Sequence, residues 1–141
     1  MTGFRLAREL DAVTVQVTQL ALSDLRLMDD ARFPWLLLVP RRPEIAEIID
    51  LVPADRLTLL DEIAVASQAL KEVTACDKLN IGAIGNIVPQ LHVHVVARYR
   101  TDAAWPGPVW GSGPAVAYAA AERDKLLSRL HAALSSPLSE P

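Results

Sequence analysis

Two of the three histidines in this chain stand two positions apart, in a segment where polar and apolar residues alternate. Residues 90–96 read Gln-Leu-His-Val-His-Val-Val. Because side chains alternate along a β-strand, Gln90, His92 and His94 are predicted to share one face of a strand over residues 90–98. Imidazole can act as a nucleophile, a proton carrier or a metal ligand, and a carboxamide both donates and accepts hydrogen bonds. This face is therefore the predicted site of chemistry.

The elements that must position these histidines can be predicted from periodicity. The apolar run over residues 35–39 predicts a strand buried on both faces, ended by Pro40. Proline suits the first turn of a helix, so a long helix is predicted from Pro53. Its buried stripe recurs at helical spacing and comprises Leu59, Ile63, Ala66, Leu70 and Val73. Further strands are predicted over 14–17, 22–28 and 78–83, and a last helix over 115–134. The pattern predicts an α+β fold, with an antiparallel sheet packed against a long central helix and a C-terminal helix.

Length and composition narrow the class of protein. The 141 residues are 51% hydrophobic and 22% charged, which predicts a single domain over residues 1–141, with a frayed tail over 135–141. The net charge of −3 argues against nucleic-acid binding through a basic surface, although a few placed donors can still hold a small anion. The single cysteine, Cys76, excludes an internal disulfide and fits a cytoplasmic location. No run approaches the roughly 20 apolar residues that cross a bilayer, so no membrane association is expected.

A Gly-rich loop precedes the histidines, with the sequence Asn-Ile-Gly-Ala-Ile-Gly-Asn-Ile-Val-Pro over residues 80–89. Together with the histidine spacing and the order of elements, this loop resembles the signature of the histidine triad (HIT) superfamily of nucleotide hydrolases and transferases. The family pattern is His-φ-His-φ-His-φ-φ, and the chain is similar to the bacterial branch that carries Gln-Leu-His-Val-His. The resemblance implies a HIT-like fold, a homodimer and a nucleotide or dinucleotide ligand. It implies no certain cofactor, although a divalent metal could accompany a nucleotide substrate.

The resemblance also implies catalytic roles. His92 matches the family nucleophile, which attacks the α-phosphorus to give a covalent nucleotidyl-histidine that water or another acceptor resolves. His94 matches the third triad position, where it would bind a phosphoryl oxygen or help protonate the leaving group. Gln90 stands at the first triad position, where the family has a histidine, and it cannot carry a proton charge near neutral pH. Trp35 replaces a further family histidine, on the strand that leads to Val-Pro.

Four more residues match the binding positions of the family. Gly85 and Asn86 correspond to the loop that approaches the phosphate, since glycine admits the backbone and the amide can donate. Asn80 is a second amide donor just upstream. Asp30, or its neighbour Asp29, falls where the family binds ribose hydroxyls. The plainer readings stay open: the asparagines would only satisfy loop backbone, and the aspartates would only shape a turn.

The expected function is that of a hydrolase or nucleotidyl transferase acting on a nucleoside phosphate, a phosphoramidate or a dinucleoside polyphosphate. One alternative is a nucleotide-binding or sensing module that Gln90 and Trp35 have weakened as a catalyst. Another is a zinc-binding protein that uses His92 and His94, although zinc would need a third or fourth ligand from elsewhere. A purely structural role for the two histidines is the plainest alternative.

Overall fold

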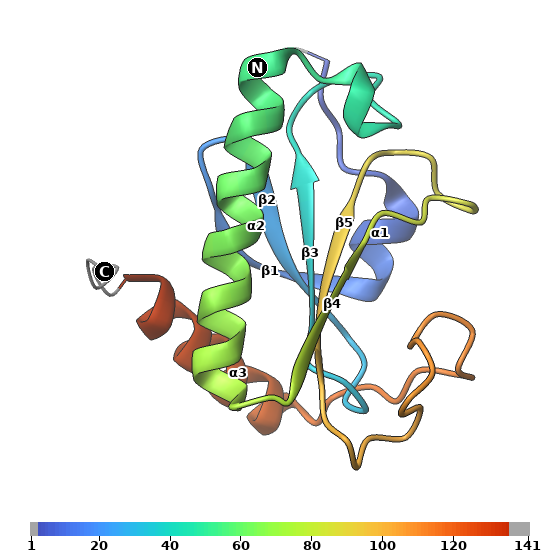
Figure 1. The fold of residues 1–141 in the computed structure, drawn as a ribbon, viewed down its shortest axis with the longest axis vertical. Helices are drawn as coiled ribbons and strands as arrows, with labels where there is room; N and C mark the ends of the chain where they lie inside the picture. The colour runs from blue at the N-terminus through green and yellow to red at the C-terminus, as the bar shows by residue number, and fades with distance from the viewer. Residues whose placement is uncertain (1–2, 136–141) are drawn as a thin grey trace.

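The computed structural model describes residues 3–135. In chain order the elements are α1 (Arg8–Val13), β1 (Thr14–Gln19), β2 (Ser23–Met28), β3 (Trp35–Pro40), the 3₁₀ turn η1 (Ile48–Asp50), α2 (Pro53–Thr74), β4 (Lys78–Gly82), β5 (Val93–Arg98) and α3 (Ala120–Ser135). The strands form one antiparallel sheet in the order β1-β2-β3-β5-β4, with α2 lying along it (Figure 1). The predicted α+β fold is confirmed, and the strand that carries His94 lies inside the sheet, between β3 and β4.

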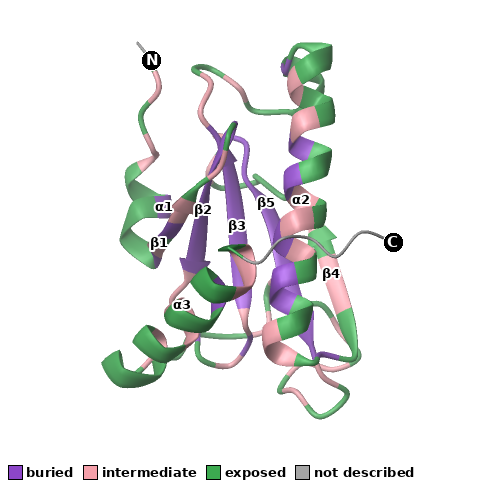
Figure 2. Cartoon of the chain, turned by 90° about the vertical axis from the view of Figure 1, so that its left-hand side faces the viewer, coloured by how far each residue is buried: buried purple, intermediate pink, exposed green. Residues whose placement is uncertain are grey.

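The sheet is covered on both faces by different elements. The long helix α2 and the C-terminal helix α3 pack over one face, on a core that includes Leu36 and Val95. A smaller cluster around Phe33 and Trp35 lies on the other face, where α1 and the loop after β5 contribute side chains. Figure 2 shows α1 and α2 on opposite sides of the buried central strands. Burial on both faces explains why β3 is an uninterrupted apolar run.

Side chains alternate between the two faces of the sheet along β5, and this alternation determines which face carries the functional side chains. Val93 and Val95 belong to the core under α2, so His94 and Val96 project to the opposite face. That face also receives Trp35 from β3, whose backbone pairs with Val96. The functional side chains are therefore separated from both long helices by the sheet itself.

The long helix begins at Pro53, as predicted, and its predicted stripe is buried or packed against the core: Leu59, Ile63, Ala66, Leu70 and Val73. Glu62 lies on the same inward-facing stripe, where a charged residue is not expected. Its carboxylate accepts hydrogen bonds from the backbone N–H groups of Leu22 at 2.8 Å and Ser23 at 3.0 Å. A buried carboxylate needs such donors. The side chain therefore joins α2 to the turn between β1 and β2.

The strand that carries the histidines begins later than predicted, at Val93 and not at residue 90. Its antiparallel register with β3 would place Leu91 opposite Pro40, which has no N–H to donate to a ladder. The N–H of Leu91 instead donates to the carbonyl of Ile45, at 2.9 Å. The chain therefore leaves the sheet just before β5.

The last helix also begins later than predicted, at Ala120. Residues 112–119, called the strap below, are not helical. Two of their backbone N–H groups donate to aspartates on the turn after β2. The N–H of Val116 donates to Asp30 at 3.3 Å and that of Tyr118 donates to Asp29 at 2.9 Å. These hydrogen bonds hold the segment against the turn after β2.

Most of the predicted frayed tail over 135–141 lies outside the described residues. Within them, Ser135 is helical and ends α3. No helix among residues 3–135 combines the length and apolar character needed to cross a membrane.

A buried ion pair organises the loop that follows β5. Arg98 donates to both carboxylate oxygens of Asp102, at 2.8 and 3.0 Å, and their side chains are 1% and 4% exposed. Asp102 also accepts hydrogen bonds from the backbone N–H groups of Tyr99, Ala104 and Trp105. The hydrogen bonds from Arg98 are the largest cause that lowers the pKa of Asp102, to about 2; burial opposes them and the backbone donors assist.

We expect Asp102→Asn to lower the free energy of unfolding by about 3 kcal/mol, because it leaves the buried Arg98 charge without its partner. Because the pKa of Asp102 is depressed in the folded state, its contribution is present above its ordinary value near 4 and is lost as pH falls towards about 2. Urea unfolding between pH 2 and 7 measures both effects. Asp124→Asn, in an exposed pair with Arg123, is the matched control and should change little. Equal pH dependence of stability in wild type and Asp102→Asn would contradict the assignment.

Candidate functional site

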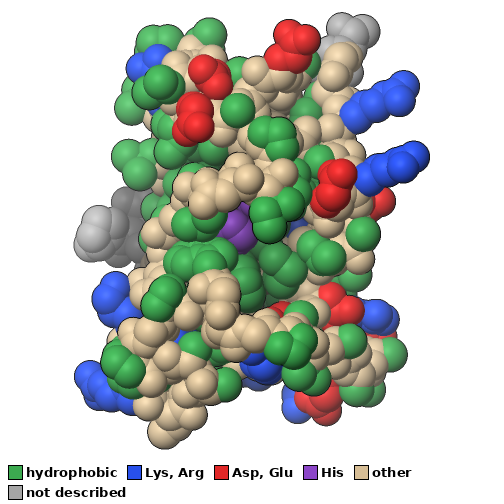
Figure 3. Space-filling view, turned by 90° about the vertical axis from the view of Figure 1, so that its right-hand side faces the viewer, with side chains coloured by type: hydrophobic (Ala, Val, Ile, Leu, Met, Phe, Trp, Pro, Cys, Tyr) green, Lys and Arg blue, Asp and Glu red, His purple; other side chains and the backbone are tan. Residues whose placement is uncertain are grey.

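A pocket of about 450 Å³ opens on the face of the sheet that carries His94. Strands β2, β3 and β5 provide its floor, and the Gly-rich loop and the loop after β5 provide its walls. Figure 3 shows a histidine side chain inside a hollow surrounded by hydrophobic side chains. Apart from the two indoles, the polar side chains that line the pocket are Asp30, Arg32, Asn86, His92 and His94.

His92 presents one free ring nitrogen to this pocket. Its Nδ1 lies 2.7 Å from the backbone carbonyl oxygen of Gln90. A carbonyl can only accept, so Nδ1 carries the proton and donates it, which leaves the lone pair on Nε2. The predicted shared face is confirmed for His92 and His94, whose rings lie 4.9 Å apart between centroids.

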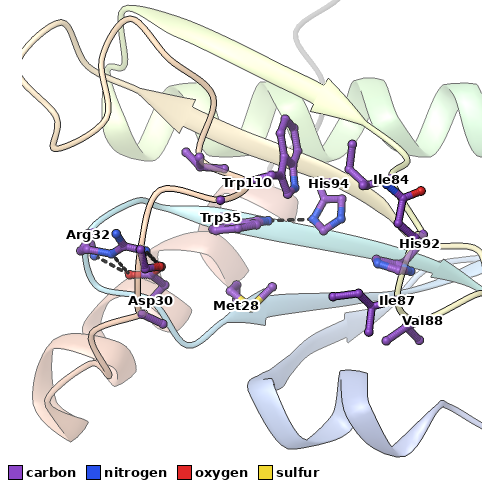
Figure 4. Close-up of a pocket in the computed structure, with 16 residues that line it drawn as sticks. Met28, Asp30, Arg32, Trp35, Ile84, Ile87, Val88, His92, His94 and Trp110 are labelled. Atoms are coloured by element: carbon purple, nitrogen blue, oxygen red, sulfur yellow. Dashed lines mark hydrogen bonds and ion pairs between the residues drawn. The ribbon is translucent and has the colours of Figure 1, made fainter.

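His94 is buried between two tryptophans. The indole Nε1 of Trp35 donates to Nδ1 of His94 at 2.9 Å, as the dashed line in Figure 4 shows. Trp110 packs edge-on against the same imidazole, with ring centroids 5.3 Å apart. Burial, and secondarily the neighbouring His92, lowers the pKa of His94 to about 4. The His94 ring is therefore neutral at neutral pH.

The Gly-rich loop lies at the pocket, as predicted. Gly85 and Asn86 both line it and are exposed to solvent. Gly85 has a φ of +63°, in the left-handed region that favours glycine, so the tight loop depends on the absence of a side chain there. Ile84, Ile87 and Val88 from the same loop add an apolar wall.

Asp30 also lines the pocket, but its carboxylate is already engaged. Arg32 donates to both of its oxygens through Nε at 3.0 Å and Nη2 at 2.8 Å, and the backbone N–H groups of Arg32 and Val116 add two more donors. Burial alone would raise the pKa of Asp30, but the hydrogen bonds from Arg32 and Val116 outweigh it and lower the pKa. Arg32 also donates to the carbonyls of Ser112 and Gly113, at 3.2 Å each. Asp30 therefore shapes the turn and holds the strap, and ribose binding stays a prediction.

The structure does not bring Gln90 and Asn80 to the pocket lining. The Gln90 carboxamide accepts from the N–H of Ala7 at 2.8 Å and donates to the carbonyl of Arg5 at 2.7 Å. The expectation that its carboxamide lies with both imidazoles in this pocket is wrong, because Gln90 precedes β5 and its side chain holds the N-terminal segment; Gln90 and His92 line a smaller neighbouring pocket. Asn80 is bound elsewhere too: its Oδ1 accepts from Arg98 at 2.8 Å. What Gln90 contributes to the site is its backbone carbonyl.

Sequence reasoning missed two residues at the site. Arg32 was not a candidate, although an arginine two positions after an aspartate in a turn is a signal for such a pair. Trp35 was expected in the core, and its hydrogen bond to His94 depends on the register between β3 and β5. No spacing within the sequence reveals that contact.

Comparison with known proteins was made on both sequence and structure. The HIT domain family matches residues 8–101, which include all five strands and α2. A comparison with curated proteins gave no significant match.

Three solved structures are similar over nearly the whole chain. A histidine triad protein from Bradyrhizobium japonicum has 48% identity and a TM-score of 0.92, covering 94% of this chain and 98% of its own. One from Sinorhizobium meliloti has 44% identity and a TM-score of 0.91, with the same coverage. One from Marinobacter aquaeolei has 40% identity and a TM-score of 0.91, covering 94% and 96%. With this likeness and a family match that includes both pocket histidines, the chain belongs to the histidine triad (HIT) family.

Proposed function

We propose that the pocket binds a nucleotide and that His92 is the nucleophile of a hydrolase or nucleotidyl transferase. The observation that carries this proposal is the hydrogen bond from His92 Nδ1 to the Gln90 carbonyl. It leaves the Nε2 lone pair as the reactive position of a histidine that lines the pocket. A nucleophile held in one tautomer by a fixed acceptor is a recurrent arrangement in covalent catalysis.

The reaction divides into two displacements at the α-phosphorus. Nε2 of His92 attacks and a P–N bond forms, while the bond to the leaving group breaks and the leaving group takes the electron pair. An acceptor, either water or a second alcohol or amine, then attacks the same phosphorus. It loses a proton, the P–N bond breaks, and the electron pair returns to Nε2. Division into two steps lowers the barrier of one difficult displacement.

The pocket lining suits a nucleotide in both shape and polarity. The loop around Gly85 and Asn86 can approach a phosphoryl group with amide donors, and Nε2–H of neutral His94 can donate beside it. The apolar wall includes Met28 and Trp110, which can pack against a base. Lysine is absent from the described lining, and its charged side chains, Asp30 and Arg32, pair with one another.

A binding or sensing module is the second candidate, and one observation favours it. No described side chain in the pocket lining is placed to protonate a leaving group at neutral pH. Neutral His94 is a weak acid, and the Asp30 carboxylate is ionised and engaged by Arg32. Such a pocket would hold a nucleotide and turn it over slowly, unless the leaving group departs without added protonation.

The zinc alternative gains no support. Among the described residues, no group of three or more histidine, cysteine, aspartate or glutamate side chains is placed to hold a metal ion. His92 and His94 would offer two ligands, and zinc sites in proteins need at least one more from the chain.

We also propose a homodimer, as the family resemblance implies. Strand β4 is an edge of the sheet (Figure 1), and Ile81 on it is 50% exposed. The nearby helix α2 exposes Leu57 and Leu60. An edge strand with unpaired backbone groups is a ready surface for pairing. Sedimentation should therefore give twice the chain mass, and Ile81→Asp should give the monomer; a monomeric wild type would contradict the proposal.

We expect His92→Asn to abolish the covalent adduct and to lower turnover on the order of 10⁴-fold, because asparagine cannot attack phosphorus. The protein is incubated with a panel of nucleoside phosphates, phosphoramidates and dinucleoside polyphosphates, then quenched for intact-mass analysis. His131→Asn is the matched control: His131 is exposed on α3 and bonds the carbonyl of Val17, away from the pocket. It should keep both adduct and turnover.

Equal turnover in wild type and His92→Asn, with no adduct in either, would contradict covalent catalysis. Calorimetric binding of the same nucleotides separates the two candidates. Binding that survives His92→Asn, without turnover in either protein, would support the sensing module.

Restoring the family histidine, with Gln90→His, should change kcat less than about tenfold, because the side chain at position 90 is bound to the N-terminal segment and is absent from the lining of the larger pocket. It should instead lower the free energy of unfolding by about 1 kcal/mol, through loss of the bonds to residues 5–7. Steady-state kinetics and urea unfolding measure the two effects. A large gain in rate would show that a side chain at position 90 does reach the chemistry.

A further inference from the structure

The two imidazoles of the pocket are held by different kinds of partner. His92 Nδ1 donates a hydrogen bond to the backbone carbonyl of Gln90, which can only accept. His94 Nδ1 meets the indole N–H of Trp35, which can only donate. A nitrogen that accepts an N–H must carry the lone pair, so the proton of the neutral His94 ring is on Nε2. The two rings therefore present opposite nitrogens to the pocket: a lone pair from His92 and an N–H from His94.

We propose that Trp35 is a positioning residue that locks His94 as its Nε2–H tautomer, so that His94 acts as a fixed hydrogen-bond donor and not as a proton shuttle. The tautomer stands on the geometry alone. The use of that donor, to bind an oxygen on the phosphoryl group, rests on the proposed function.

Packing prevents Trp35 from turning its N–H elsewhere. The side chain is 8% exposed on the central strand β3 and meets Phe33 and Trp110 edge-to-face, at centroid distances of 6.5 and 6.3 Å. A side chain enclosed in this way occupies one rotamer. The N–H of Trp35 is therefore a fixed feature of the sheet face.

The His94 ring is enclosed on its other side. Gly82 stands opposite His94 in the pairing of β4 with β5. A Cβ at that position would lie 3.4 Å from Trp110 Cη2, an ordinary van der Waals distance, so the Trp110 ring lies directly over residue 82 and packs against the imidazole. Trp35 and Trp110 thus hold the ring between two indoles, and rotation that would release Nδ1 is blocked.

Protonation of His94 would break the hydrogen bond from Trp35 that fixes its tautomer. Because Nε2 already carries a proton, the second proton would bind to Nδ1. The N–H of His94 and the N–H of Trp35 would then point at each other, and both are donors. This contact between two donors disfavours the protonated ring. Burial, which lowers the pKa of His94, disfavours the protonated ring as well. The charged or titratable groups around the ring are few: His92 beside it, and Asp30 with Arg32 along the same pocket. Strands β3 and β4 face it with Trp35 and Gly82, and the loop after β5 with Trp110.

The tautomer can be read directly in the full-length chain, without a nucleotide. In protein labelled with ¹⁵N-histidine and ¹⁵N-tryptophan, long-range proton–nitrogen spectra separate protonated from unprotonated ring nitrogens. We expect His94 protonated at Nε2 only, His92 protonated at Nδ1 only, and a scalar coupling across the hydrogen bond from Trp35 to His94. His94→Asn assigns the signals.

Trp35→Phe keeps an aromatic ring and removes the N–H. We expect loss of the coupling, a shift of the His94 nitrogens towards a mixture of tautomers, and a titration midpoint above the wild-type value of about 4; burial and His92 still keep it below 6.5. Trp110→Phe is the matched control. Trp110 also packs on His94, but its Nε1 is buried without a hydrogen-bond partner among the described residues. Its replacement should leave the coupling and the tautomer intact, which separates the hydrogen bond from packing.

A His94 protonated at Nδ1, or no coupling in the wild-type spectrum, would overturn the proposal even if Trp35→Phe fails to fold. An unchanged tautomer in folded Trp35→Phe would also overturn it. With a substrate, kcat of Trp35→Phe should gain a pH dependence near its new His94 midpoint that wild type lacks, with KM unchanged. If the spectra show the lock but no nucleotide is turned over, the proposed function fails while the role of Trp35 stands.

Discussion

The position of β5 between β3 and β4 is the constraint on which the site depends. Its hydrogen bonds to both neighbours set the register, and burial of both faces sets the direction of every side chain. His94 consequently projects away from α2, next to Trp35 and opposite Gly82. A slip of one residue would turn His94 into the core under α2. The chemistry of the pocket thus follows from strand pairing rather than from local conformation.

Backbone geometry just outside β5 is equally important. Because Pro40 cannot continue the ladder, the chain leaves the sheet before Val93 and the Gln90 carbonyl can accept from His92. The same departure turns the Gln90 carboxamide towards the N-terminal segment. One irregularity therefore orients His92 and also explains why position 90 does not need a histidine to complete this arrangement.

Two arginine–aspartate pairs attach the irregular parts of the chain to the sheet. Arg98 and Asp102 organise the start of the loop that supplies Trp110, and Asp30 with Arg32 holds the strap before α3. Each carboxylate also accepts backbone N–H groups, so charge and hydrogen bonding are satisfied together. Because both pairs are internally neutralised, they shape the pocket without giving it a strong net charge.

Periodicity and the proline at position 53 predict the fold class, the long helix and the shared face of His92 and His94, and the family resemblance adds the place of Gly85 and Asn86 at the pocket. The periodic features depend on the spacing of neighbouring residues, which a sequence records directly. The partners of Gln90, Asn80 and Asp30 and the tautomer of His94 follow from contacts between residues far apart in the chain. Those outcomes depend on which donors and acceptors long-range pairing brings within about 3 Å, as the contact of Trp35 with His94 shows, and a sequence carries no direct record of such distances.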